Sequence, residues 1–196
     1  MANLVPIVEG QSEVESVPIL LRKISDSIQT YDVNIVKPFR VKRNRVVKAG
    51  EIERAVKQAI RSRDNIGAII VILDADDDCA KDLAARLKRR CGTVTGLPVS
   101  VVIAVKEYEC WLLGAKESLR GIAGIKGDAC CPPNPESIRG AKGKLSQNMG
   151  SQSYVEVIHQ PSFTAQMDIG LARQNCPSFE KLYREAGSLL SQVSGI

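Results

Sequence analysis

The sequence predicts an α/β protein with a mostly parallel, four-stranded sheet flanked by helices and a helical extension at its C-terminal end. Strand-like and helix-like patterns alternate up to Val105, as expected for parallel strands joined by helical crossovers. The run from Ala68 to Leu73 is apolar without alternation, which is typical of a central strand covered on both faces. Beyond Val105 no further buried strand is evident, and glycine and proline become frequent between Gly121 and Gly150.

The first half of the alternating region contains two predicted strands and two predicted helices. Leu4 to Val8 is a short apolar strand, and Glu13 to Ile28 has the apolar spacing of an amphipathic helix. Val33 to Val41 is predicted to be the second strand. Gly50 to Arg63 places its apolar residues on one helical face and is predicted to be the second helix.

The second half of this region repeats the order. Ala68 to Leu73 is the third strand, and the acidic run Asp74 to Asp78 follows it directly. Asp77 or Asp78 is expected to cap a helix that extends to about Cys91. Pro98 to Val105 is the fourth predicted strand, which completes the sheet.

The extension is predicted to be helical, with helix patterns near Ala165 to Arg173 and Ser178 to Val193. We therefore divide the chain into an α/β core over residues 1–106 and an extension over residues 107–196 that packs on the core. The boundary is not sharp, because Tyr108 to Leu113 is apolar enough to belong to the core. A single domain fits the sequence as well.

Composition narrows the class of protein. The chain has 196 residues, 44% of them hydrophobic, and a net charge of +5. The N-terminus lacks the pattern of a secretion signal and no stretch is long enough to span a membrane, so we expect a cytoplasmic protein. The six cysteines form no Cys-x-x-Cys pair and the only histidine, His159, has no cysteine near it in the sequence, which argues against a zinc site.

Acidic residues follow two of the predicted strands. Glu9 and Glu13 flank the end of the first strand, with Gly10 between them for a sharp turn, and Asp74 and Asp76 alternate after the third strand. In a parallel sheet these clusters would meet at one edge, where ligands bind. Two such charges repel by about 1 kcal/mol at 4 Å in water and by about 4 kcal/mol at an effective dielectric constant of 20. Helix capping explains single acids, but the four together predict a site for Mg²⁺ or Mn²⁺.

These residues resemble a known family. The strand, Glu-Gly-x-x-Glu and helix around Glu9, followed by a later strand that ends in Asp-x-Asp, resemble the Toprim domain of topoisomerases, primases and overcoming-lysogenization-defect (OLD) nucleases. Several further segments resemble small stand-alone Toprim-like proteins that are often encoded beside an AAA-type ATPase. These segments are Val105 to Leu113, Pro135-Glu136, Lys142, Asp168, Ala172 and Ser178-Phe179.

The resemblance implies a Toprim-like, Rossmann-like fold and a metal-dependent nuclease. Glu9, Asp74 and Asp76 match the shared Toprim acids, and Glu13 matches the second acid of OLD-type nucleases, which use two metal ions. Lys142 or Lys144 matches the lysine that such nucleases place near the scissile phosphate. The implied partners are nucleic acid, with DNA favoured, and an AAA-type ATPase. The implied role is defence against phage or other foreign DNA.

Two further sets of residues have open interpretations. Glu109 either faces the metal site or is a surface carboxylate paired with Lys106, and Trp111 is expected in the core. A basic segment, which lies near the expected site, either binds a phosphate backbone or is an ordinary solvated surface, and we favour nucleic-acid binding. Its members are Lys37, Arg40, Lys42, Arg43, Arg45 and Lys48.

Two other function classes compete with the nuclease. A receiver-like signalling module would use Asp74 as phosphoacceptor and Lys106 at the end of the last strand, although Glu9 is followed by glycine where a receiver has a second acid. A non-catalytic, partner-binding protein would keep the fold without the chemistry. The sequence leaves the oligomeric state open and is compatible with a homo-oligomer.

Overall fold

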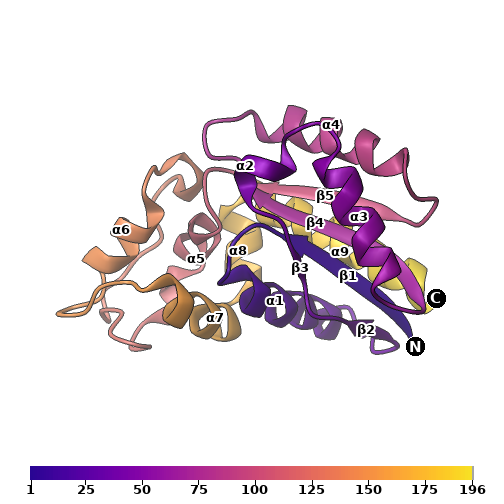
Figure 1. Cartoon of the computed structure of the whole chain (residues 1–196). Coiled ribbons are helices and arrows are strands. Elements are labelled where there is room, and N and C mark those ends of the chain that lie inside the picture. Colours follow the sequence, from indigo (N-terminus) through magenta and orange to yellow (C-terminus); the bar gives the residue numbers. More distant parts are fainter. Residues whose placement is uncertain (196) are drawn as a thin grey trace.

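All paired strands run parallel and form one sheet. A computed structural model describes residues 1–195 and places, within them, a five-stranded sheet in the order β2-β1-β4-β5, with β3 beside β1 (Figure 1). The strands are β1 (Ala2–Val8), β2 (Val33–Ile35), β3 (Phe39–Arg40), β4 (Ile66–Asp74) and β5 (Val99–Ala104). The predicted α/β class and mostly parallel sheet are confirmed, with β1 and β4 as direct neighbours.

The predicted strand from Val33 to Val41 is wrong as a single element. Ile35 of β2 pairs with Leu4, whereas Phe39 of β3 pairs with Ile7, so four steps along this segment face three steps along β1. The segment therefore carries one extra residue, as in a β-bulge. Pro38 lies in the break, where its missing N–H removes a donor from the ladder. The fifth strand of the sheet, β3, is the second half of the segment that we predicted as one strand.

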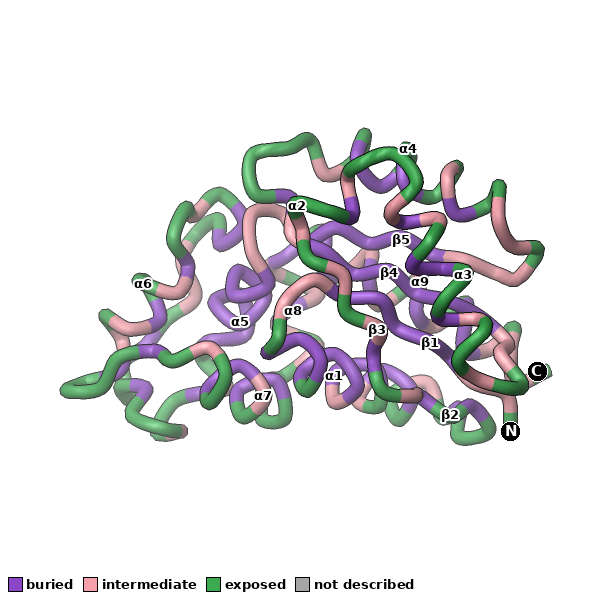
Figure 2. The backbone as a smooth tube through the Cα atoms, viewed as in Figure 1, coloured by how far each residue is buried: buried purple, intermediate pink, exposed green. Residues whose placement is uncertain are grey.

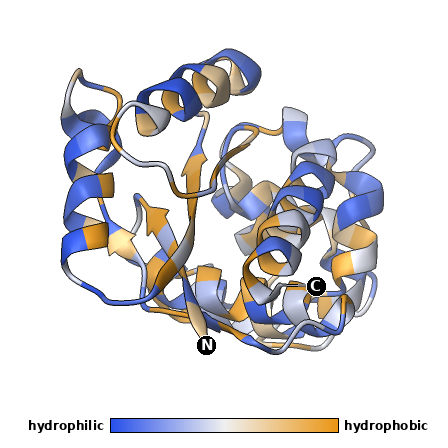
Figure 3. Cartoon of the chain, turned by 90° about the vertical axis from the view of Figure 1, so that its right-hand side faces the viewer, coloured by the Kyte–Doolittle hydropathy of each residue, from blue (hydrophilic) through white to orange (hydrophobic). Residues whose placement is uncertain are grey.

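Helices cover both faces of the sheet because side chains alternate along each strand. In β4, Ile70 and Ile72 face a core that includes apolar residues of α1 (Glu13–Ser27) and α9 (Pro177–Ser194). Ile69 and Val71 face the opposite core, shared with α3 (Glu51–Arg61) and α4 (Ala80–Gly92). Figure 2 shows β1, β4 and β5 buried along most of their length, and Figure 3 shows hydrophilic residues on the outer sides of the helices. Each buried Ile contributes about 1.5–3 kcal/mol relative to exposure.

The predicted cap of α4 is wrong. Cys79 occupies the N-cap position, and the cap shows no side-chain hydrogen bond within residues 1–195. Asp77 and Asp78 instead form ion pairs with basic side chains, Asp77 with Lys106 and Arg139 and Asp78 with Arg43. Both side chains are therefore paired with cations and do not accept hydrogen bonds from the helix terminus.

The residues after 106 share a buried cluster with the sheet. α5 (Glu109–Gly114) carries Trp111, whose ring packs against Tyr108 and against Phe179 of α9. The segment continues through five further helices, two of them 3-10 helices, before α9 returns along the sheet face (Figure 1). These are η1 (Lys116–Leu119), η2 (Pro135–Ser137), α6 (Ala141–Gln147), α7 (Glu156–Gln166) and α8 (Ile169–Asn175).

The helix predicted from Ala165 to Arg173 is wrong as one element. α7 ends at Gln166 and α8 begins at Ile169. Asp168 caps α8, since its carboxylate accepts hydrogen bonds from the N–H groups of Gly170 and Leu171. This cap starts a new helix where the apolar pattern alone indicated continuity. Short α2 (Arg43–Val46) completes the set of elements and lies near the carboxyl ends of the strands.

No helix within residues 1–195 combines the length and apolar character needed to cross a membrane.

A buried hydrogen-bonded group fixes the C-terminal helix to α5 and yields the first prediction. The Trp111 indole donates to Ser178 Oγ at 2.8 Å, and the Ser178 hydroxyl and N–H both donate to Glu136. Ser178→Ala leaves the indole and the carboxyl without this partner, which costs about 1–3 kcal/mol. We expect the Tm to fall by about 2–12 °C.

The matched control is Ser188→Ala, an exposed serine on the same helix. We expect it to unfold at or slightly above the wild-type Tm, since alanine favours the helix. Equal Tm values for both variants would contradict the structural role of Ser178.

Candidate metal centre

Three carboxylates gather at the carboxyl ends of two adjacent strands. Glu9 follows β1, Glu13 begins α1, and Asp74 is the last residue of β4. One oxygen of each carboxylate lies within 4.8 Å of one oxygen of each of the other two. The two acidic clusters therefore meet, as predicted, because β1 and β4 are hydrogen-bonded neighbours that end at the same edge.

The turn between β1 and α1 holds Glu13 in place. The N–H groups of Glu9 and Gly10 both donate to Glu13 Oε2 at 3.1 Å. A Cβ at Gly10 would lie 3.2 Å from Glu13 Oε1, tighter than ordinary van der Waals contact. Glycine at position 10 thus allows the Glu13 carboxylate to fold back over the turn. The two N–H groups hold Glu13 Oε2, and Oε1 does not take part in these hydrogen bonds.

Burial makes the charged forms of these acids unfavourable. Burial and the neighbouring Glu13 raise the pKa of Glu9 to about 8. Burial also raises the pKa of Glu13, and burial followed by repulsion from Glu13 and Glu9 raises the pKa of Asp74 well above its ordinary value. Glu9 Oε2 is buried and has no hydrogen-bond partner among residues 1–195. All three groups are therefore harder to ionise than carboxyls in water.

Asp76 lies at the rim, outside the group of three. Its φ of 52° is left-handed, which ends the strand alternation on which we based the expectation that it points with Asp74. It is exposed, and Arg43 Nε lies 3.5 Å from its carboxylate. The same nitrogen lies 3.8 Å from Glu9 Oε2, and Arg43 Nη2 lies 2.6 Å from Asp78. Arg43 thus links the rim to Glu9 of the carboxylate group.

Glu109 is buried beside the cluster and is not a surface partner of Lys106. It is 1% exposed and accepts hydrogen bonds from Tyr154 Oη at 3.0 Å and Gln160 Nε2 at 3.2 Å. Burial raises the pKa of Glu109 to about 7, and its charge adds to the raised pKa of Asp74. Lys106 instead donates to Asp77 and to the Asp76 carbonyl.

Of the two candidate lysines, Lys142 is the one beside the acids. Its ammonium pairs with Glu156, and its charge lowers the pKa of both Glu13 and Glu109 against the effect of burial. The neighbouring carboxylates raise the pKa of Lys142 itself above its ordinary value, so it stays charged. Lys144 is exposed, and its charge acts on Lys116 instead.

The basic segment divides among different surroundings. Arg40, Lys42 and Arg45 line a pocket beside the acidic site, while Arg43 faces the carboxylates. The remaining two lie apart from this pocket: Lys37 borders a hollow over α1, and the carbonyl of exposed Lys48 accepts a hydrogen bond from Arg90. The segment is therefore not one continuous binding surface.

Sequence reasoning missed the polar residues that the extension brings to the site. Tyr154 and Gln160 hold Glu109, Gln160 also accepts from Ser16 Oγ at 2.9 Å, and Glu156 holds Lys142. The one available signal was Gln160, a polar residue on the inner side of a helix that also buries Phe163. The contacts of Arg43 with the acids could not be predicted, because the sequence does not distinguish it from the other basic residues of the same segment.

The fold and the acids define a class: an α/β protein with a carboxylate cluster at the carboxyl edge of a parallel sheet. Residues 8–185 match the model of a family described as "Domain of unknown function (DUF4276)". Because this match spans most of the sequence, the chain belongs to that family. Comparison with curated proteins gives no match, and comparison with solved structures gives none either.

The raised pKa values predict how stability depends on pH. A carboxyl whose pKa is raised on folding, such as Glu9 from 4.5 to about 8, favours the folded state at low pH. That contribution is lost as the pH rises through the folded value. In EDTA we expect the Tm to fall by at least about 3 °C between pH 5.5 and 8.5, since one pKa unit is worth about 1.4 kcal/mol.

Mn²⁺ should reverse this loss at pH 8.5, because the ion competes with protons for the same oxygens. A concentration of 100 times Kd stabilises by about 2.7 kcal/mol, or about 5–11 °C. We expect Asp74→Asn to raise the Tm in EDTA and to remove the response to Mn²⁺. The exposed Asp128→Asn serves as control and should behave as wild type. A Tm that Mn²⁺ leaves unchanged at pH 8.5 would contradict the metal centre.

Proposed function

We propose that this protein is a metal-dependent nuclease that cleaves phosphodiester bonds with Mg²⁺ or Mn²⁺ held by Glu9, Glu13 and Asp74. The observation that carries the proposal is the meeting of these three carboxylates within 4.8 Å at the ends of β1 and β4. Acids at this edge occupy the position where open parallel sheets bind ligands.

The residues present suit a hard divalent cation. All three groups offer carboxylate oxygens, the donor type that Mg²⁺ and Mn²⁺ prefer. Glu9 Oε2 is buried without a hydrogen-bond partner among the described residues, and burial and the neighbouring Glu13 raise the pKa of Glu9 despite the charge of Arg43. When bound, the ion supplies a Lewis acid that activates water and neutralises charge on the phosphate.

Side chains around the acids supply the remaining functions. Lys142 stays charged beside Glu13 and Glu109, so it can hold a phosphate oxygen. Arg43 can do the same from the rim, by exchanging its exposed partner Asp78 for a phosphate. Tyr154 and Gln160 fix Glu109 Oε1, whose pKa of about 7 suits it to take up or release a proton near neutral pH. Asp76 can approach the site only if its pairing with Arg43 changes.

The wider role rests on the resemblance to small Toprim-like proteins. It supports DNA as the substrate, an AAA-type ATPase as the partner, and defence against foreign DNA inside the cell. Asp74 and the segment around Trp111 carry that resemblance.

Cleavage of DNA by the purified protein tests the proposal. We expect wild type to degrade plasmid or single-stranded DNA with Mg²⁺ or Mn²⁺, alone or with an AAA-type ATPase partner. Asp74→Asn removes a proposed metal ligand. Loss of a residue that only hydrogen-bonds to a metal ligand costs about 10- to 100-fold in activity, so we expect a larger fall in the rate for Asp74→Asn. Lys142→Gln should lower it by about 10- to 1000-fold.

Asp128→Asn, which removes an exposed carboxylate elsewhere, should cleave at the wild-type rate. Equal cleavage by wild type and Asp74→Asn would show that a contaminant is responsible. Absence of cleavage with either ion and either DNA, even with the ATPase added, would contradict the nuclease.

A further inference from the structure

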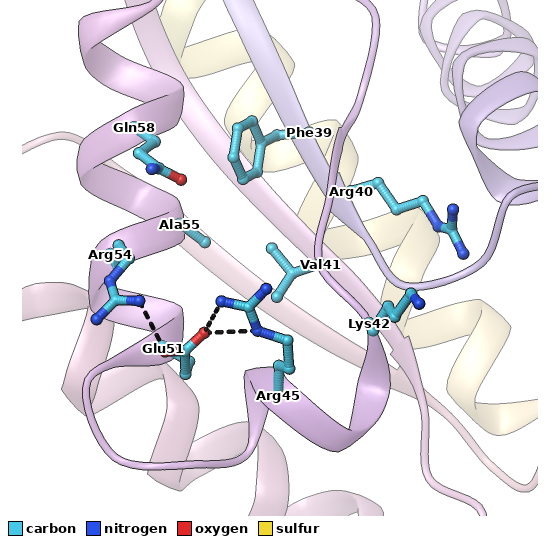
Figure 4. Close-up of a pocket in the computed structure, with 9 residues that line it drawn as sticks. All are labelled: Phe39, Arg40, Val41, Lys42, Arg45, Glu51, Arg54, Ala55 and Gln58. Carbon is cyan, nitrogen blue, oxygen red and sulfur yellow. Dashed lines mark hydrogen bonds and ion pairs between the residues drawn. The ribbon is translucent and has the colours of Figure 1, made fainter.

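A pocket of about 320 Å³ lies beside the carboxylates, between the β3–α2 segment and α3. Its volume is at the lower end of the range for small-molecule sites. Figure 4 shows that its lining has two different ends. Phe39 and Gln58 lie together at one end, and Arg45, Glu51 and Arg54 lie at the other, with Ala55 between them.

The charged end is ordered and cationic. Glu51 Oε2 accepts from Arg45 Nε at 3.0 Å and lies 2.9 Å from Arg45 Nη2, while Glu51 Oε1 lies 3.0 Å from Arg54 Nη1. Lys42 also lines the pocket, so the cationic side chains of Lys42, Arg45 and Arg54 outnumber the single negative charge of Glu51. The carboxylate therefore fixes the two guanidinium groups without neutralising this end of the pocket, and exposed N–H groups of both arginines remain free for an anion.

The uncharged end offers a flat apolar face and an amide. The half-buried Phe39 ring borders the pocket, and Gln58 of α3 projects beside it (Figure 4). A phenyl ring stacks with any nucleobase, and an amide provides both a donor and an acceptor to a base edge. An aromatic face at one end and cations at the other match the two parts of a nucleotide.

The pocket is joined to the carboxylate site through α2 and β3. Arg43 and Arg45 are two positions apart on α2 and therefore project in nearly opposite directions, Arg43 to the acids and Arg45 to the pocket. Arg40 lines the pocket, and its Nε donates to the Glu9 carbonyl at 3.1 Å. A strand held at the carboxylates can thus continue across α2 into the pocket.

We infer that this pocket binds an unpaired nucleotide of the substrate strand, next to the bond that is cleaved. The base stacks on Phe39 and meets the Gln58 amide, and the phosphate lies against Lys42, Arg45 and Arg54. A base in a duplex cannot enter, so the protein prefers single-stranded over double-stranded nucleic acid. This inference rests on the proposed function, since it concerns the same substrate.

Binding of a fluorescein-labelled single-stranded 12-mer in EDTA tests the inference apart from catalysis. Loss of one stacked base costs about 5- to 150-fold in affinity, so Phe39→Leu should weaken binding by at least about 5-fold, and Phe39→Tyr should restore it. Arg54→Gln should weaken binding and lower the slope of log affinity against log salt by about 1. Lys57→Gln, which removes the same charge from an exposed position of α3, is the control and should have a smaller effect on both.

The Tm of each variant establishes that it is folded, and Gln58→Leu is a second test at an exposed position. Unchanged binding in Phe39→Leu and Arg54→Gln would overturn the inference, as would a 12-bp duplex that binds as tightly as the single strand. Adenosine monophosphate provides the other arm. If Phe39→Leu weakens the binding of adenosine monophosphate but not the binding of the 12-mer, the pocket binds a free nucleotide and the inference that it binds a nucleic-acid strand is overturned. Because EDTA prevents metal-dependent cleavage, a negative nuclease assay with positive binding here would count against the proposed function alone.

Discussion

The confinement of three carboxylates, those of Glu9, Glu13 and Asp74, in one partly buried space is the constraint on which the site depends. Burial raises the pKa of all three above the ordinary value, and repulsion from neighbouring carboxylates adds to this effect. Such a group does not stabilise the fold above neutral pH, and this is the feature on which the proposed metal site rests. The surrounding cations, Arg43 and Lys142, offset only part of the negative charge and remain in reach of an incoming anion.

The sheet and the segment after residue 106 form this site together. β1 and β4 bring the acids to one edge, whereas Tyr154 and Gln160 come from the later segment and hold Glu109 beside them. Gln160 also bonds Ser16 of α1, so a continuous set of hydrogen bonds joins the extension to the helix that carries Glu13. The site therefore contains residues from both the predicted core and the predicted extension.

The sequence was sufficient to predict a parallel sheet, because short apolar runs mark its buried strands. It was also sufficient to predict that the acids meet, because parallel strands end at the same edge of the sheet. It was insufficient where one residue changed the path of the backbone. The extra residue near Pro38 divided a strand, the left-handed φ of Asp76 turned it to the rim, and Asp168 started a new helix. The burial of Glu109 was also hidden, since it depends on side chains about fifty positions away along the chain.

The position of α9 has a consequence for synthesis. This helix, Pro177–Ser194, packs on the face of the sheet that β1, β4 and β5 share, and those strands are all translated long before it. Until the last residues leave the ribosome, α1 can cover part of that face but α9 cannot, so some of the apolar surface around Ile70 and Ile72 stays exposed, and such surface favours aggregation. The sheet can therefore reach its final packing only after translation is nearly complete.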